Sequence, residues 1–129
     1  MSERGSVTVV AAGLLFFLAV FVTGCADVAR VLAAVSRAQT AADAAALAAA
    51  QDLVAPGPAG PDAVAAEYAE RNGAELVSCD CSAGASEAVV EVQESVEGLF
   101  LLPGYRMVHA TARAVAGAGA PVSTASPSP

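Results

Sequence analysis

The sequence predicts an α+β protein. A long N-terminal transmembrane helix continues as an extramembrane rod, and a short helix and a small antiparallel β-meander follow. Three observations support this prediction: an uncharged apolar run near the start, a helical spacing of apolar residues that continues beyond it, and alternating runs in the last third. A chain of 129 residues has room for one domain at most.

The first element is the apolar run at residues 7–26, which reads VTVVAAGLLFFLAVFVTGCA and contains no charge. A helix rising 1.5 Å per residue spans about 30 Å over this length, which is the hydrocarbon thickness of a bilayer. A buried core helix is the alternative, but the rest of the chain has too little apolar surface to surround it. We therefore predict a transmembrane helix at 7–26, preceded by a short cytoplasmic N-terminus at residues 1–6.

The second element is the extramembrane continuation of that helix at residues 27–54. No Gly or Pro lies between Cys25 and Val54, and Asp27 and Arg30 are spaced as a favourable helical pair. Apolar residues recur at three- and four-residue steps, as on one helical face. They are Val28, Val31, Leu32, Val35, Ala38, Ala42, Ala45, Ala49 and Leu53. The simplest prediction is one unbroken rod.

A Pro/Gly linker at residues 55–61 ends the rod, because three prolines and two glycines cannot continue a helix. A small α+β domain is expected at residues 62–116. Its short helix is expected to begin with Asp62 as a cap and to run to about Arg71, where Asn72-Gly73 closes it.

Three strand-like runs follow, at residues 74–81, 88–96 and 105–116. In the second run Ala88, Val90 and Val92 alternate onto one face. In the third run we expect three residues to face inward: Val108, Ala110 and Ala112. This pattern predicts a small meander packed against the helices.

The remaining segments carry simpler expectations. The apolar stretch 99–102, which reads Leu-Phe-Leu-Leu, is expected in the core, with a membrane-facing lip as the alternative. The acidic residues of the second strand and its end are expected to form a solvated face; these are Glu87, Glu91, Glu94 and Glu97. Residues 117–129 are expected to be a disordered tail.

Composition excludes several functions. The net charge is −7, Lys is absent, and the six arginines form no cluster, so nucleic acid is not an expected partner. Aromatic residues make up 5% of the chain and Trp is absent, so a cleft for a small-molecule substrate is not expected. We expect no enzyme, with no catalytic residue, cofactor or metal.

The cysteines leave alternatives open. Strand alternation places Cys79 and Cys81 on one face, where they could be free or buried thiols, or form a disulfide with each other or with a second chain. Metal binding needs more ligands than this pair and the single His109 provide. Cys25 follows Val22-Thr23-Gly24, which resembles a lipobox, so lipidation at Cys25 is an alternative to a permanent anchor.

The segment 37–50 carries a family resemblance. It reads RAQTAADAAALAAA, with Arg37, Gln39, Asp43 and Leu47 as its characteristic residues. It resembles the signature of TadE/TadG-like proteins, which are minor pilin-like components of the Flp pilus and tight-adherence system. The Arg4-Gly5-Ser6 opening is similar too, and the alanine-rich composition resembles the short actinobacterial branch described as secretion- or helicase-neighbourhood members.

The resemblance covers residues 4–53 and implies a pilin-like outline. It also implies a non-enzymatic, membrane-anchored pseudopilin-type component of a pilus-assembly or secretion apparatus. Because the N-terminal flank is only six residues long and the distal part is acidic and contains cysteines, we expect a single-pass topology. The N-terminus is expected on the inner side of the cytoplasmic membrane and the C-terminal domain outside. Expected partners are the lipid bilayer and other pilin-like or secretion-system proteins, bound through the Ala-rich helix face. The alternative for this face is packing onto the chain's own small domain. The alternative is a surface lipoprotein binding module anchored through Cys25.

One departure from the family pattern concerns processing. Prepilin-like members carry a Glu in the apolar span shortly after the processing glycine. Counted from Gly5, the corresponding position is Val9 or Val10, and no acid occurs in residues 7–26. Three N-termini therefore stay open: the intact chain, cleavage after Gly5, and lipidated Cys25.

Overall fold

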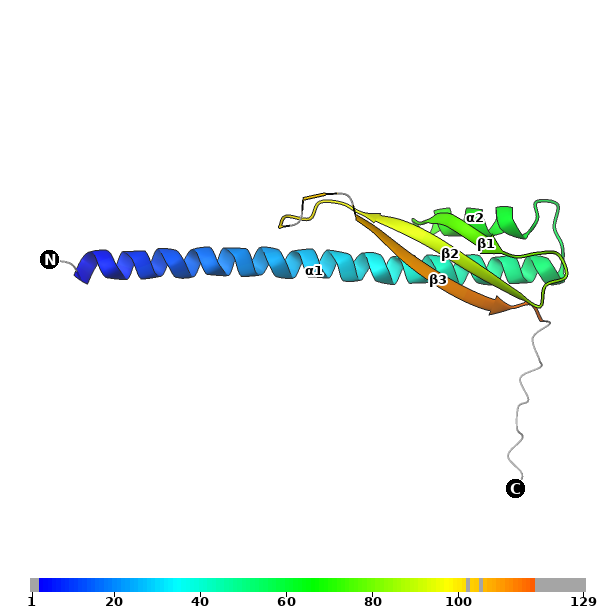
Figure 1. Cartoon of the computed structure of the whole chain (residues 1–129), viewed down its shortest axis with the longest axis horizontal. Helices are drawn as coiled ribbons and strands as arrows, with labels where there is room; N and C mark the ends of the chain where they lie inside the picture. The colour runs from blue at the N-terminus through cyan, green and yellow to red at the C-terminus, as the bar shows by residue number, and fades with distance from the viewer. Residues whose placement is uncertain (1–2, 102, 105, 118–129) are drawn as a thin grey trace, which may run out of the picture.

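The protein is described by a computed structural model that covers residues 3–101, 103–104 and 106–117. Its elements in order are α1 (Glu3–Val54), α2 (Pro61–Arg71), β1 (Glu75–Asp80), β2 (Glu87–Val96) and β3 (Arg106–Val115). Figure 1 shows one long helix whose C-terminal half carries the short helix and the sheet. The predicted α+β class, with its pilin-like outline, is confirmed.

The unbroken rod is also confirmed, because α1 is a single helix of 52 residues. At 1.5 Å per residue it is about 78 Å long. Alanine, the residue with the highest helix propensity, dominates its second half. The helix stops at Val54, two residues before Pro56. In the described part of the chain, this one helix is long and apolar enough to cross a membrane.

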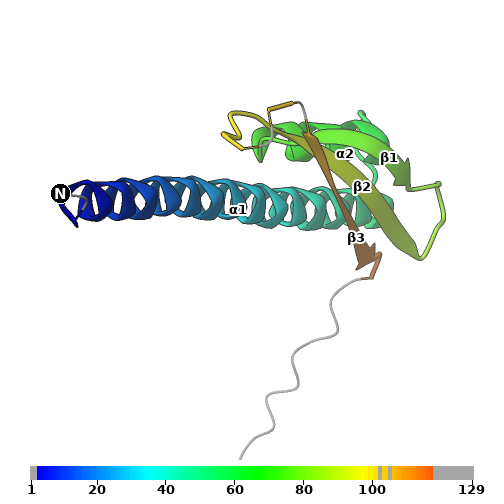
Figure 2. The same ribbon diagram turned by 60° about the vertical axis from the view of Figure 1, so that its left-hand side comes forward.

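The sheet has the strand order β1-β2-β3, with both neighbouring pairs antiparallel. The pairing of β2 with β3 is regular from Glu87 opposite Val115 to Val96 opposite Arg106. The pairing of β1 with β2 is interrupted by a bulge between Leu76 and Ser78. The three predicted strands are thus present as a meander, and Figure 2 shows them crossing α1 obliquely.

The strand faces follow the predicted alternation. Ala88, Val90 and Val92 of β2 are fully buried, while Ala110 and Ala112 of β3 are buried at the edge of the same core. Val108, also expected inward, is half-buried and packs against that core.

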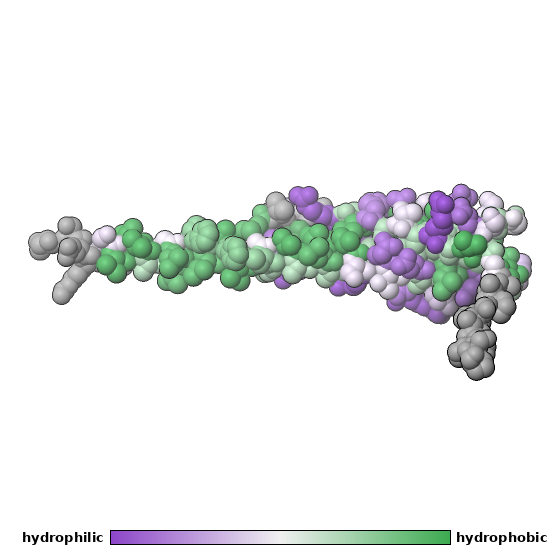
Figure 3. Space-filling view, turned by 90° about the horizontal axis from the view of Figure 1, so that it is seen from below, coloured by the Kyte–Doolittle hydropathy of each residue, from purple (hydrophilic) through white to green (hydrophobic). Residues whose placement is uncertain are grey.

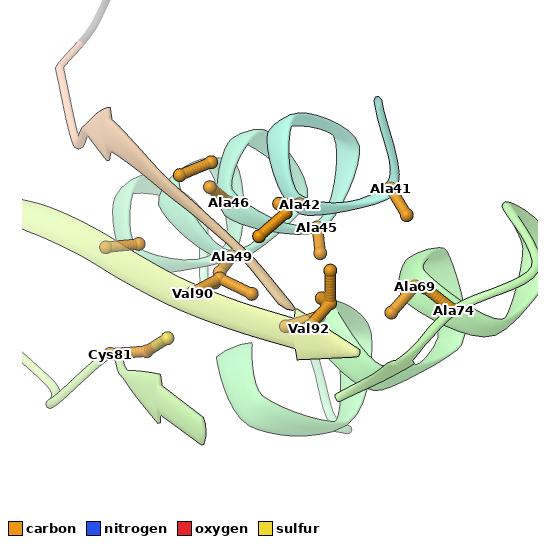
Figure 4. Packing of buried hydrophobic residues seen from close by; sticks show 14 of the residues in the cluster. Ala41, Ala42, Ala45, Ala46, Ala49, Ala69, Ala74, Cys81, Val90 and Val92 are labelled. Atoms are coloured by element: carbon orange, nitrogen blue, oxygen red, sulfur yellow. The ribbon is translucent and has the colours of Figure 1, made fainter. Parts of the chain in front are cut away.

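The inner sheet face packs on the alanines of α1 (Figure 4). Ala38, Ala42, Ala45 and Ala49 have no exposed surface. Of the two interpretations of this face, packing onto the chain's own domain is confirmed for these residues, and binding of another protein through them is wrong. Because alanine lacks a long side chain, the chain's own sheet and α2 approach α1 closely and occupy the face.

The short helix differs from prediction at its start. Gly60 is the N-cap and Pro61 occupies the first turn, and no side chain caps the helix. Asp62 is therefore not the cap. It lies within the first turn, where its negative charge interacts favourably with the helix dipole. The C-terminal end is as predicted, with Asn72 as C-cap and Gly73 at a positive φ of 80°.

The connection after β2 corrects another prediction. Of the apolar stretch expected in the core, Leu99 is buried, but Phe100 is 63% and Leu101 48% exposed. Leu102 lies outside the described residues, as does the tail from residue 118. Figures 1 and 2 show this loop reaching beyond the rest of the sheet toward the N-terminal half of α1.

The surface divides along the length of the molecule. Side chains of α1 from Gly5 to Val22 are exposed, and no other part of the described chain covers them. Figure 3 shows this half as a hydrophobic cylinder and the domain half as mixed, with hydrophilic side chains prominent. A bare cylinder of apolar side chains is stable in lipid rather than in water.

Candidate functional site

The most elaborate contact outside the core lies where the β2–β3 loop meets α1, directly after the predicted membrane span. Asp27 is 6% exposed. Its two carboxylate oxygens accept hydrogen bonds from the backbone N–H groups of Phe100 and Leu101, each at 2.8 Å. A carboxylate on α1 thus fixes the tip of a loop that is 73 residues away in the sequence.

These bonds determine the ionisation of the carboxyl group. The backbone N–H of Phe100, followed by that of Leu101, holds the pKa of Asp27 below its ordinary value of 3.8. Burial opposes this shift, and the charge of Arg30 adds to it. Sequence spacing predicted that Asp27 pairs with Arg30 along the helix, whereas both side chains bond the loop.

Arg30 holds the other side of the loop. Its guanidinium donates a hydrogen bond to the carbonyl oxygen of Gly98 and lies over the Phe100 ring, 4.7 Å from the ring centroid. Gly98 has a φ of +73°, which a residue with a side chain rarely adopts. Nearer the N-terminus of α1, a Cβ added to Gly24 would be 3.4 Å from Leu101 Cδ1, so Leu101 already lies close to the helix.

A second contact joins the signature segment to the sheet. Arg37 Nε donates to Glu94 Oε1 at 2.8 Å, and the Glu94 side chain is only 9% exposed. The expectation of a solvated Glu94 is wrong, because Glu94 continues the even-numbered inward face of Val90 and Val92. Arg37 provides the counter-charge for this buried carboxylate through Oε1. The other oxygen, Oε2, has no hydrogen-bond partner among the described residues.

The other signature residues lie on the opposite, exposed side of α1. Gln39 Nε2 donates to Asp43 Oδ1 at 3.1 Å, four residues along the helix. Leu47 is 56% exposed. The signature therefore combines two surfaces: alanines under the sheet, and polar residues with one leucine facing outward.

The uncovered side of α1 remains apolar beyond the predicted span. Phe21, Val28, Leu32 and Val35 are between 45% and 63% exposed. Their spacing of seven, four and three residues places them along one line of the helix. With Cys25, which is also exposed, they form what we call the outer stripe.

The cysteines of the sheet are joined. Cys79 and Cys81 form a disulfide with Cα atoms 5.3 Å apart. The Asp62 carboxylate lies near the two sulfur atoms, with all three groups within 4.8 Å of one another. Sulfurs bonded to each other supply no thiolate for a metal. His109, on the outer sheet face, has its Nδ1 3.3 Å from Glu91 Oε1.

Two of these contacts were not predicted from the sequence: that of Arg37 with Glu94, and that of Asp27 with the loop. For Glu94 the signal was present, since period-two alternation extends from Ala88 through Glu94 to Val96. For Asp27 no local signal exists, because its partners are backbone groups of a distant loop.

Comparison with protein families gives a match over the N-terminal part of the chain. Residues 5–52 match a family model described as "Putative Flp pilus-assembly TadE/G-like". The resemblance predicted from residues 4–53 is confirmed over the apolar span and the Ala-rich segment. Comparisons with curated proteins and with solved structures gave no match.

Proposed function

We propose, from the premise that residues 5–52 match a Flp pilus-assembly family, that this chain is a membrane-anchored component of a pilus-assembly or secretion apparatus. Its role is that of a pseudopilin-type, non-enzymatic subunit. The observation that carries the proposal is the division of α1, whose first half is an uncovered apolar cylinder while its second half carries a folded domain. Such a molecule presents a small domain at a fixed height above a bilayer.

The proposed topology is single-pass, with the N-terminus inside and the domain outside the cytoplasmic membrane. A disulfide between Cys79 and Cys81 supports this orientation, because disulfides persist in oxidising compartments. The distribution of arginines does not by itself favour one orientation, since Arg30 lies outside and Arg4 inside in this topology.

The proposed partner surface is the outer stripe. The alanine face is occupied by the chain's own sheet, whereas Val28, Leu32 and Val35 expose apolar side chains beyond residue 26. Exposed apolar side chains that continue in line with a membrane helix are suited to packing against a neighbouring helix. We assign this stripe to contact with another pilin-like subunit.

The non-enzymatic role is supported by the state of the nucleophile candidates. The sulfur of Cys79 is in the disulfide, and His109 lies on the outer sheet face beside Glu91. Two acidic residues of β2 lie beside basic groups of β3: Glu91 beside His109, and Glu87 beside Arg113.

Co-purification in mild detergent tests the proposal. The native chain is expected to recover other pilus or secretion-system subunits, and Leu32→Asp is expected to lose them because it places a charge in the outer stripe. The matched control is Val115→Asp, another exposed apolar residue, which lies at the end of β3 and should retain the partners. Recovery of no such subunit by the native chain, or equal recovery by both variants, would contradict the proposal.

Mass spectrometry of the N-terminus separates the anchor from the lipoprotein alternative. An intact Met1 or Ser2 supports the helical anchor, and a new N-terminus at Ser6 adds prepilin-type processing. An acylated Cys25 as first residue would mean that residues 1–24 are removed, which leaves only two residues of the 7–26 span and establishes the lipoprotein instead.

A further inference from the structure

The loop tip at Phe100 and Leu101 is exposed at the height where the membrane span ends. Leu101 lies against Gly24, within the last turn of the 7–26 span. Phe100 is 63% exposed although it is a large apolar residue at a loop tip. The domain core cannot explain this arrangement, because the loop reaches away from it toward the N-terminal half of α1 (Figure 1).

The loop is held in this position by specific contacts. Asp27 accepts both backbone N–H groups at the tip, and Arg30 bonds the Gly98 carbonyl and covers one face of the Phe100 ring. The backbone donors of the tip are therefore satisfied by protein. This matters because an unsatisfied N–H group costs several kcal/mol in a lipid environment.

We propose that Phe100 and Leu101 form a second membrane contact, inserted into the outer phospholipid interface of the same bilayer that α1 crosses. The inference rests on the proposed anchor and adds to it a function for the loop. The occupant is lipid because the exposed tip is continuous with the lipid-facing surface of α1 through Gly24 and Leu101. Arg30, with an apolar stem and a charged head, has the character of residues at the membrane–water boundary.

The consequence is a fixed orientation of the domain. α1 alone would leave the domain free to tilt with the helix relative to the membrane plane. A second contact beside α1 resists tilting toward or away from the side that carries the loop. The outer stripe is thereby held at a constant angle to the membrane plane, which suits assembly with neighbouring subunits.

Tryptophan fluorescence in vesicles tests the proposal, since the chain contains no Trp and each variant is a single-Trp reporter. The full chain is reconstituted in phosphatidylcholine–phosphatidylglycerol vesicles as Phe100→Trp, with Tyr68→Trp as the domain control and Phe16→Trp as the span control. We expect F100W to show blue-shifted emission and several-fold stronger quenching by lipid brominated near the headgroup than Y68W. Aqueous acrylamide should quench F100W less than Y68W.

Equal quenching of F100W and Y68W by bilayer and aqueous quenchers, with F16W quenched by deeply brominated lipid, would overturn the loop contact while leaving the anchor intact. If F16W also escapes lipid quenching, the anchor and the loop contact are both wrong. Because Phe100→Trp alters the tip, the native chain is examined as well. Headgroup spin-labelled lipid should broaden the Phe100 and Leu101 resonances but spare Tyr68, and unaffected Phe100 resonances would likewise refute the contact.

Discussion

Removal of Arg37 should destabilise the domain, although the side chain of Arg37 is 63% exposed. The substitution Arg37→Ala leaves the Glu94 carboxylate buried without its counter-charge and without the 2.8 Å bond from Nε. Hydrogen bonds to charged groups contribute about 1.5–3 kcal/mol. Because Arg37 is partly solvated, we expect a loss of about 2 kcal/mol, which is about a thirtyfold change in the folding equilibrium.

A double substitution distinguishes the effect of breaking the Arg37–Glu94 pair from the effect of changing the residue at position 37 alone. In Arg37→Ala/Glu94→Leu the inner sheet face carries an apolar side chain and no buried charge remains. Replacement of a buried ion pair by apolar groups is often neutral or stabilising. We therefore expect the double variant to recover to within about 1 kcal/mol of the native chain, giving a coupling energy between the sites.

The assay is pulse proteolysis of the full chain in mild detergent over a urea series. It measures the fraction of molecules in which the domain is unfolded at each urea concentration. Arg113→Ala is the matched control, because its contact with Glu87 is 3.5 Å long and both side chains are exposed. Such surface pairs contribute about 0–1 kcal/mol. If R37A is no less stable than R113A, Glu94 does not depend on Arg37 and the reasoning fails.

Two further predictions concern the helix face and the loop. Ala42→Leu should cost about 1–3 kcal/mol because it overpacks the contact between α1 and the sheet, whereas Ala33→Leu on the exposed side should be neutral; equal urea midpoints for the two variants would contradict the packing. The loop contact should depend on pH, since the pKa of Asp27 is lowered in the folded chain. Its stabilisation is complete above the ordinary value of 3.8 and is lost as the pH falls through the lowered folded value. Hydrogen exchange at the Phe100 and Leu101 amides, extrapolated across pH, should show protection that disappears only in that acidic range and is absent in Asp27→Asn at every pH; protection that persists in D27N would refute the assignment.

Much of the architecture could be predicted because it depends on local patterns. The continuous helix follows from the absence of Gly and Pro between Cys25 and Val54, together with alanine's helix propensity. The three strands follow from alternation and from the turn residues between them. The family match to residues 5–52 rests on the same local stretch of sequence.

The partners of individual side chains could not be predicted in the same way. Arg37 and Glu94 are 57 residues apart in the sequence, and Arg30 and Gly98 are 68 apart. No helical or strand period relates such positions, so charged residues without a local partner were expected to be solvated. For Glu94 the sequence did contain a signal of burial, because the alternation along β2 places it on the inward face.

By itself, the sequence determined that the N-terminal segment is long and apolar enough to cross a membrane, that α1 is continuous, and that the domain is α+β, because each depends on composition and spacing along the chain. The resemblance to a pilus-assembly family rests on the residues of the same segment. Only the tertiary structure decided which helix face is free. The alanines that looked like a partner surface are covered by the chain's own sheet, since small side chains permit the closest approach. It also decided that Phe100 and Leu101 are exposed, because Asp27 and Arg30 hold the loop at the end of the span instead of releasing it into the core.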